Sequence, residues 1–307
     1  MPVIAHIYHV WDTGLVEDGW LDGEVPLHYV QWCPPDRGRG PSLLLLHGTS
    51  SNALYWTRVA RSLTDRRIVA LDLRGHGRSS RPDSGYSVED MAADAARALD
   101  ALGLEQSFVV GHSWGVAIAL QLAAARPDVV VGAAFVDGPV SPLSNCLSWP
   151  EAERQMRTPS PIYRDLEDAE AAQANLLGQA WGDDLRDFVR AGFRRTEAGW
   201  VPVLPEKARL QILRSLYDFR PDALLPRISR PVLMVMGSKA GDGVAPDVLA
   251  CWRNGSELAV RHCRQGRLLR YSSQHDIPLV RTMELARDVE AVATEAGSSV
   301  SAPNWAC

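Results

Sequence analysis

The chain has 307 residues, of which 46% are hydrophobic and 22% charged, and its formal net charge is −5. This length suits one large domain or a domain with an insertion, and the composition is that of an ordinary globular protein. The negative charge and the absence of a basic stripe argue against a nucleic-acid partner, because a surface that follows phosphates needs clustered cations.

Cysteine usage and apolar runs bear on the compartment. The five cysteines are Cys33, Cys146, Cys251, Cys263 and Cys307. They are scattered and lack C-x-x-C spacing, so neither a disulfide framework nor a zinc site is expected. Residues 1–10 do not read as a signal peptide, and the longest aliphatic run, residues 43–46, is too short to cross a bilayer. We therefore expect a cytoplasmic protein that does not act at a membrane.

The first half of the chain alternates apolar strands with helices. In chain order, strands are expected at residues 6–15, 26–32, 42–46, 67–71, 107–110 and 129–136, and helices at 53–63, 88–102 and 116–125. The 88–102 helix has apolar residues at helical spacing, with Ser87 as its cap and Gly103 as its stop. This alternation predicts an α/β fold with a mostly parallel central sheet and helices on both faces.

The alternation stops at residue 140 and resumes near residue 227. The intervening segment holds several prolines and helix-like stretches, which are residues 166–181, 183–195 and 206–217. Strands at 231–236 and 268–271 and helices at 245–252 and 278–296 follow. We therefore expect a core built from residues 1–139 and 227–296, an inserted helical cap at 140–226, and a disordered tail at 297–307.

Gly111-His112-Ser113-Trp114-Gly115 is the most informative stretch. It fits G-x-S-x-G, with an apolar strand before it and a helix after it, which is the context of a nucleophile elbow. In such an elbow a sharp turn holds the serine in a strained conformation, and flanking glycines are needed because a Cβ would collide with its neighbours. The hydroxyl of Ser113 would then lie at a helix N-terminus, which favours negative charge.

Further motifs follow in a fixed order. They are His47-Gly48, Asp72-Leu-Arg-Gly-His-Gly-Arg-Ser79, the serine pentapeptide, Asp242 with Pro246, and Gln274-His275-Asp276-Ile277-Pro278. With them, residues 25–295 resemble the α/β-hydrolase superfamily, in its capped branch of esterases, lactonases and C–C hydrolases. The resemblance implies a catalytic triad in the order Ser, acid, His.

The resemblance implies His275 as the base, because it follows the last strand and is one of two histidines after Ser113. The acid should accept a hydrogen bond from the far nitrogen of His275. Relatives carry Gly-x-x-Asp after the strand at 231–236, whereas here Asp242 comes two residues late. We favour Asp242 as the acid and keep Asp137, at the end of the 129–136 strand, as the alternative.

An oxyanion hole needs two donors aimed at the developing charge, each worth about 3 kcal/mol. The resemblance implies the backbone amides of Thr49 and Trp114 for these donors. Tryptophan after the nucleophile resembles haloalkane dehalogenases and epoxide hydrolases, but those enzymes use an aspartate nucleophile. Ser113 therefore disfavours both of those reactions, and the Trp114 indole is expected to form a pocket wall.

The cap sets the substrate in this branch of the superfamily. We name Trp114, Trp149 and Trp181 as candidate substrate-binding residues, because pocket linings are mostly apolar. Acidic residues cluster between 165 and 187 with Arg186 as the one cation, which indicates a solvated helical face or, alternatively, a rim that recognises an amine. No metal-ligand spacing or phosphate-binding loop is visible, so no cofactor is expected.

The sequence thus predicts a cofactor-independent serine hydrolase that cleaves a small or medium, largely apolar ester or lactone. Two other reactions stay open, C–C bond hydrolysis of a diketone and an aminopeptidase activity like that of proline iminopeptidases. The alternative outside enzymes is a ligand receptor on the hydrolase fold.

Overall fold

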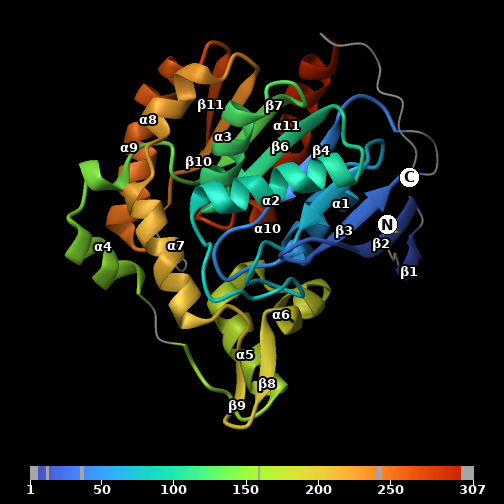
Figure 1. The fold of residues 1–307 in the computed structure, drawn as a ribbon, viewed down its shortest axis with the longest axis vertical. Coiled ribbons are helices and arrows are strands. Elements are labelled where there is room, and N and C mark those ends of the chain that lie inside the picture. The colour runs from blue at the N-terminus through green and yellow to red at the C-terminus, as the bar shows by residue number, and fades with distance from the viewer. Residues whose placement is uncertain (1–5, 12–13, 35–37, 158–159, 240–243, 299–307) are drawn as a thin grey trace.

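The computed structural model describes residues 6–11, 14–34, 38–157, 160–239 and 244–298 (Figure 1). A nine-stranded sheet, in the order β1-β2-β3-β5-β4-β6-β7-β10-β11, forms its centre. The strands are β1 (His6–Trp11), β2 (Gly14–Leu21), β3 (Leu27–Cys33), β4 (Ser42–Leu46), β5 (Ile68–Leu71), β6 (Ser107–His112), β7 (Val130–Val136), β10 (Val232–Gly237) and β11 (Gly266–Tyr271). The strands from β5 to β11 in this order pair in parallel, and β1, β2 and β3 add an antiparallel edge. The predicted mostly parallel sheet is confirmed.

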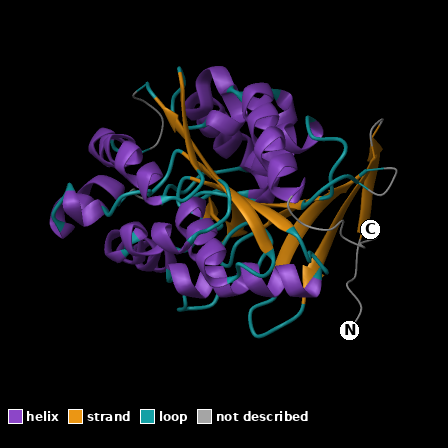
Figure 2. Cartoon of the chain, turned by 90° about the horizontal axis from the view of Figure 1, so that it is seen from above, coloured by secondary structure: helices purple, strands orange, loops and turns teal. Residues whose placement is uncertain are grey.

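Helices cover both faces of the twisted sheet (Figure 2). They are η1 (Ala53–Trp56), α1 (Thr57–Arg61), α2 (Val88–Ala101), α3 (Gly115–Ala125), α9 (Pro246–His262), α10 (Ile277–Val280) and α11 (Thr282–Ser298). Residues of α2, α3 and α9 share one buried apolar cluster, and residues of α1 and α11 share the other. The expected capping box of α2, between Ser87 and Asp90, is present.

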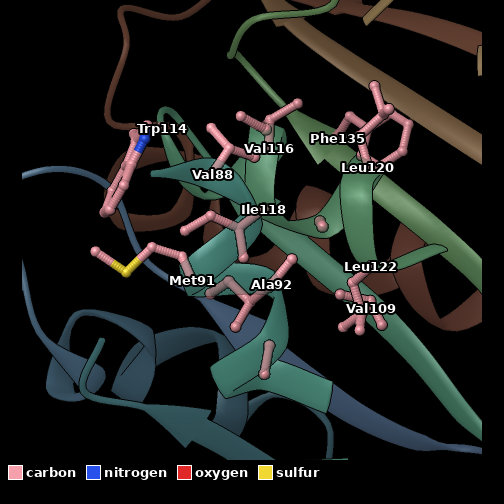
Figure 3. Packing of buried hydrophobic residues seen from close by; sticks show 14 of the residues in the cluster. Val88, Met91, Ala92, Val109, Trp114, Val116, Ile118, Leu120, Leu122 and Phe135 are labelled. Atoms are coloured by element: carbon pink, nitrogen blue, oxygen red, sulfur yellow. The ribbon is translucent and has the colours of Figure 1, made fainter. Parts of the chain in front are cut away.

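The strands supply both clusters because successive side chains point to opposite faces. In β4, Leu44 and Leu46 join the cluster of α2 and α3, while Leu43 and Leu45 join the cluster of α11. Figure 3 shows Ile118 of α3 between Met91 of α2 and the strand residues of the sheet. Every residue of β4, β5, β6, β7 and β10 is buried, which explains their continuous apolar runs.

Residues 140–226 connect β7 to β10 and contribute no strand to the nine-stranded sheet. The segment contains η2 (Leu143–Asn145), α4 (Trp149–Met156), α5 (Leu166–Leu177), η3 (Gly178–Ala180), η4 (Asp183–Leu185), α6 (Arg186–Ala191), β8 (Phe193–Thr196), β9 (Gly199–Pro202), α7 (Glu206–Asp218), α8 (Pro221–Leu224) and η5 (Leu225–Arg227). In Figure 1, α5, α6, β8 and β9 lie together at the bottom of the molecule, far from β11 near the top.

Two expectations about elements were wrong. A single helix over residues 183–195 does not form, because η4 and α6 end at Ala191 and β8 then pairs with β9 as a hairpin. The turn before β9 ends at Gly199, whose φ of 128° is one that glycine adopts readily and other residues rarely do. This glycine is the sequence signal that could have indicated the hairpin. At the N-terminus, the expected strand at 6–15 divides into β1 and β2.

The expectation that cysteines form no disulfide was also wrong. Cys146, just after η2, is bonded to Cys251 in α9 across a sequence separation of 105. Cys33 is disulfide-bonded as well, and Cys263 is a free, buried thiol. The expectation of a cytoplasmic protein rested in part on unpaired cysteines, and the Cys146–Cys251 bond removes that support. Among the described residues, no helix has the length and apolar character needed to span a bilayer.

Candidate active site

Ser113 lies at the turn between β6 and α3, as the elbow pattern predicts. Its φ of 54° is in the left-handed region, which a residue with a Cβ enters only at a cost of about 1–3 kcal/mol. A Cβ on Gly111 would come within 2.3 Å of the Gly115 carbonyl oxygen, and a Cβ on Gly115 within 2.3 Å of the Leu46 carbonyl oxygen. Both glycines are therefore required by the close approach of strand and helix.

The segment after β4 lies against Ser113. A Cβ built on Gly48 would be 2.9 Å from the Ser113 Cβ and 3.4 Å from its Oγ, so the backbone at residues 48–49 passes beside the hydroxyl. Within the described residues, neither the Thr49 amide nor the Trp114 amide donates to a backbone carbonyl in a turn or loop. Ser113 and Thr49 are half-buried, so this corner of the site is accessible to a ligand.

His275 follows β11 and is 5% exposed. Its Nδ1–H donates to Asp137 Oδ2 over 3.0 Å. Asp137 follows β7, is 1% exposed, and has a φ of 44°. The far nitrogen of the imidazole, Nε2, is then the one available for proton exchange, which is the tautomer that a serine–histidine pair requires.

Besides His275, the Gly237 amide and the Arg253 guanidinium hold the Asp137 carboxylate. Oδ1 accepts from the Gly237 amide at 3.0 Å and from Arg253 Nε at 3.2 Å, and Oδ2 accepts from Arg253 Nη2 at 2.8 Å. Burial by itself would raise the pKa of Asp137, but the hydrogen bonds and charges of His275 and Arg253 outweigh it and lower the pKa below its ordinary value. The carboxylate is thus kept ionised.

Asp242, the favoured acid, lies outside the described residues. The structure instead brings together His275 and Asp137, the alternative acid, across a sequence separation of 138. Asp137 reaches this position because β7 and β10 are adjacent, and its backbone amide bonds the Val235 carbonyl. Parallel strands that end at one edge place these loops side by side.

His112, inside the pentapeptide, is a further residue of the site. Its ring centroid is 4.7 Å from that of His275, and its Nε2 donates to the His275 carbonyl at 3.0 Å. Burial, then the charge of His275, lowers the pKa of His112 to about 4, so it stays neutral at neutral pH. Its hydrogen bond thus links the serine pentapeptide to the loop that carries His275.

The three tryptophans named from the sequence have different surroundings. Trp114 is 1% exposed, with its ring 5.9 Å from that of His76, and its Nε1 has no hydrogen-bond partner among the described residues. Trp149 packs on Tyr217, with the Arg214 guanidinium 4.7 Å from its ring centroid. Trp181 is half-buried against the apolar cluster of α1 and α11.

The acidic residues between 165 and 187 are largely paired with arginines. Asp165 and Asp168 bond Arg164, Glu170 bonds Arg186 and Arg190, and Asp184 bonds Arg58. Arg58 and Arg164 lie outside residues 165–187, so the sequence of that segment alone shows an excess of negative charge. The arrangement matches the solvated-face interpretation.

Arg253 was missed by sequence reasoning. It stands in α9, about two turns after the Pro246 that starts the helix, among many other arginines in the chain. Its contact with Asp137 spans 116 residues, so no local spacing signals it.

The profile of a family described as alpha/beta hydrolase fold matches residues 41–255. The chain is 28% identical to the 2-(acetamidomethylene)succinate hydrolase of Mesorhizobium japonicum, over 74% of this chain and 81% of the relative. It is 29% identical to epoxide hydrolase B of Mycobacterium tuberculosis, over 76% of this chain and 67% of the relative.

Among solved structures, an E-2-(acetamidomethylene)succinate hydrolase superimposes with a TM-score of 0.71 at 22% identity, over 95% of this chain and 99% of the other. That likeness concerns the fold. Together with the family match over residues 41–255, it settles the superfamily that the motifs indicated. The chain belongs to the α/β-hydrolase fold family.

Proposed function

We propose that this hydrolase cleaves a small or medium, largely apolar carboxylic ester or lactone through an acyl-enzyme on Ser113. The observation that carries the proposal is the buried Asp137–His275 pair, together with a serine at a φ of 54° whose amide donates to the carbonyl of Val136, the residue before Asp137. A serine hydroxyl is a weak nucleophile at neutral pH and needs such a base.

In the proposed mechanism, His275 Nε2 takes the Ser113 proton as the hydroxyl oxygen attacks the substrate carbonyl carbon. The amides of Thr49 and Trp114 bind the oxyanion of the tetrahedral intermediate. The protonated imidazole then gives its proton to the leaving alcohol, which releases the acyl-enzyme. Water, deprotonated by His275, attacks the acyl carbon and frees the acid and Ser113.

The acid in this mechanism is Asp137, because its contact with His275 is the one described. Asp242 stays a competing assignment that a variant can decide. We further propose that residues 140–226 act as a cap over the core of residues 1–139 and 227–296, with Trp114, Trp149 and Trp181 as candidate contacts for the apolar part of the substrate.

The names of the relatives leave the substrate class open, and the residues of this chain disfavour some of the possible reactions. An epoxide hydrolase is among them, but Ser113 disfavours the aspartyl-ester route that the superfamily uses for epoxides and halides. An aminopeptidase gains no support from the acidic cluster, since those side chains are paired with arginines. C–C bond hydrolysis uses the same triad and is distinguished by substrate alone.

A carboxylate-bearing substrate is a second candidate. One relative is named for a succinate derivative. In this chain Arg209 of α7 is 9% exposed, and its charge contributes to the lowered pKa of His76, after burial and the charge of His47. The His76 ring lies beside Trp114, the residue after Ser113, so a buried cation acts near the site.

The test compares turnover of a p-nitrophenyl ester, an acyl lactone, a β-diketone, a proline anilide and 2-(acetamidomethylene)succinate, each by wild type and Ser113→Ala. We expect the ester or lactone to be hydrolysed fastest and Ser113→Ala to lose that activity. Faster cleavage of the diketone or the anilide would contradict the ester assignment. A ligand-induced thermal shift with no turnover of any substrate would favour a receptor.

A further inference from the structure

The Asp137 carboxylate is shared between the histidine and a buried arginine. Oδ2 accepts from His275 Nδ1 at 3.0 Å and from Arg253 Nη2 at 2.8 Å, while Oδ1 accepts from Arg253 Nε at 3.2 Å. The side chains of Arg253 and Asp137 are 12% and 1% exposed. This is a two-point arginine–carboxylate pair, which fixes the plane of the carboxylate as well as its position.

The arginine is itself held in place. Its Nη1 donates to the Lys239 carbonyl at 2.7 Å. A Cβ on Gly237 would lie 2.8 Å from Nη2 and 2.8 Å from the Ser273 carbonyl oxygen, so a side chain there would crowd both the guanidinium and the backbone. Two residues earlier in α9, Cys251 is disulfide-bonded to Cys146, and its carbonyl accepts from Ser141 Oγ at 3.0 Å. The helix segment that carries Arg253 is therefore tied to the segment after β7.

We propose that Arg253 is a positioning residue of the catalytic site: it orients the Asp137 carboxylate toward His275, and its positive charge limits how strongly Asp137 stabilises protonated His275. The inference rests on the proposed function of Ser113, His275 and Asp137. Without Arg253, the carboxylate would keep its full charge for the imidazolium, and His275 would hold its proton to higher pH.

Among the residues that the structure describes, Arg253 is the cation in contact with this pair. From β6, His112 is neutral near neutral pH, because burial lowers its pKa to about 4. Beside His275 in the chain, Asp276 accepts from the Tyr55 hydroxyl at 2.8 Å, and this tyrosine of η1 also approaches His112. From α9, Trp252 contributes an uncharged ring 6.5 Å away.

The experiment measures the rate of Ser113 labelling by a fluorophosphonate probe against pH, which needs no knowledge of the substrate. The variants are Arg253→Gln and Arg253→Lys, with Arg270→Gln as the matched control. Arg270 lines the same surface cavity of about 350 Å³ as Arg253, but it bonds Ser256 and Glu257 instead of Asp137.

In Arg253→Gln we expect the acid limb of the profile to move up by about one pH unit and the plateau rate to fall about tenfold or more, because an unpaired carboxylate attracts the proton and loses its fixed plane. Arg253→Lys keeps the positive charge, so the acid limb of its profile should lie at nearly the same pH as that of wild type, while its plateau rate falls. Arg270→Gln should match wild type in both respects.

Two results would overturn the inference. One is an Arg253→Gln profile whose limb coincides with that of wild type, whatever the plateau, since a merely structural role predicts that. The other, which decides the matter if Arg253→Gln does not fold, is an Arg253→Lys plateau equal to wild type. If Ser113→Ala is labelled as fast as wild type, the proposed function itself fails, which is a distinct outcome.

Discussion

Two regions of the molecule differ in how their side chains are held. At the carboxyl ends of β4, β6 and β7, the described non-glycine residues with positive φ are Ser50, Ser113 and Asp137, and the side chains of Asp137 and His275 are buried and hydrogen-bonded. In residues 140–226, the polar contacts are mostly exposed arginine–carboxylate pairs. The first arrangement fixes the geometry of the chemistry, whereas the second tolerates change, because exposed ion pairs contribute little.

We call the loops at the carboxyl ends of β4, β6 and β7 the strand-end region. The contrast predicts that this region determines the rate of the chemical reaction, whereas residues 140–226 determine which substrate is accepted. Strain at Ser113 and Asp137 persists because the surrounding sheet over-determines their backbone, and it costs stability that the packed sheet must offset. The predictions below set changes in one region against changes in the other.

Removing the Ser113 hydroxyl should have the largest effect. We expect Ser113→Ala to lower kcat by about 10⁶-fold, since the triad acts as a unit. Steady-state hydrolysis of the best ester measures it. Thr49→Ala is the control and should retain most activity, because the proposed role of Thr49 is carried by its backbone amide. A loss of less than about tenfold in Ser113→Ala would contradict its role.

The next effect separates the two candidate acids. Asp137→Asn should lower kcat by about 10⁴-fold, because the imidazole loses its orienting and charge-stabilising partner. Asp242→Asn should change kcat by no more than a few-fold. Melting temperatures of both variants should be taken alongside, since Asn at 137 leaves the Arg253 charge without its partner. The reverse ranking of the two variants would assign the acid to Asp242.

Breaking the link between the two regions should cost stability. Replacing Cys146 and Cys251 together by serine should lower the free energy of unfolding by about 2–4 kcal/mol, because the cross-link closes a long loop in the unfolded chain. Denaturant titration under non-reducing conditions measures it. Cys263→Ser, at the free buried thiol, is the comparison for removing a cysteine without a bond. Equal stability of the double variant and wild type would contradict the linkage.

Acid should destabilise the strand-end region through its buried histidines. Burial, then neighbouring histidines, lowers the pKa of His76 to about 3 and of His112 to about 4, from 6.5. Below pH 6.5 the unfolded chain binds these protons and the folded chain does not, so stability is full above pH 6.5 and is lost as pH falls toward 4. Each histidine should contribute about 1.4 kcal/mol per pH unit in that window.

Urea unfolding between about pH 5 and 7 measures this slope. A His76→Gln variant should have a clearly smaller slope, because His76 no longer takes part while His47 and His112, whose pKa values burial also lowers, remain. A slope that is the same in wild type and His76→Gln would contradict the assignment.

Changes in residues 140–226 should have the smallest effect on reactivity. Trp149→Ala removes contacts with Tyr217 and Arg214 and should cost about 1–2 kcal/mol in stability at most. The fluorophosphonate labelling rate should stay within a few-fold of wild type, while the ranking of ester substrates changes. A large drop in the labelling rate would show that this region also sets reactivity.

What the sequence could predict was local. The elbow at Ser113 depends on a strand, two glycines and a helix within a short stretch, and the order of strands and helices follows from their apolar patterns. His275 followed from its place after the last strand. In contrast, the His275–Asp137 pair and the Cys146–Cys251 bond join residues 138 and 105 positions apart, and two aspartates followed candidate strands. Choosing between such partners needs the sheet order, which pattern and propensity do not provide.

The most direct test of the central claim is to label the protein with a fluorophosphonate probe and locate the adduct by peptide mass spectrometry. The account predicts one stoichiometric adduct on Ser113 in wild type and none in Ser113→Ala, with much slower labelling in His275→Ala. An adduct on another residue, or equal labelling of wild type and Ser113→Ala, would contradict it.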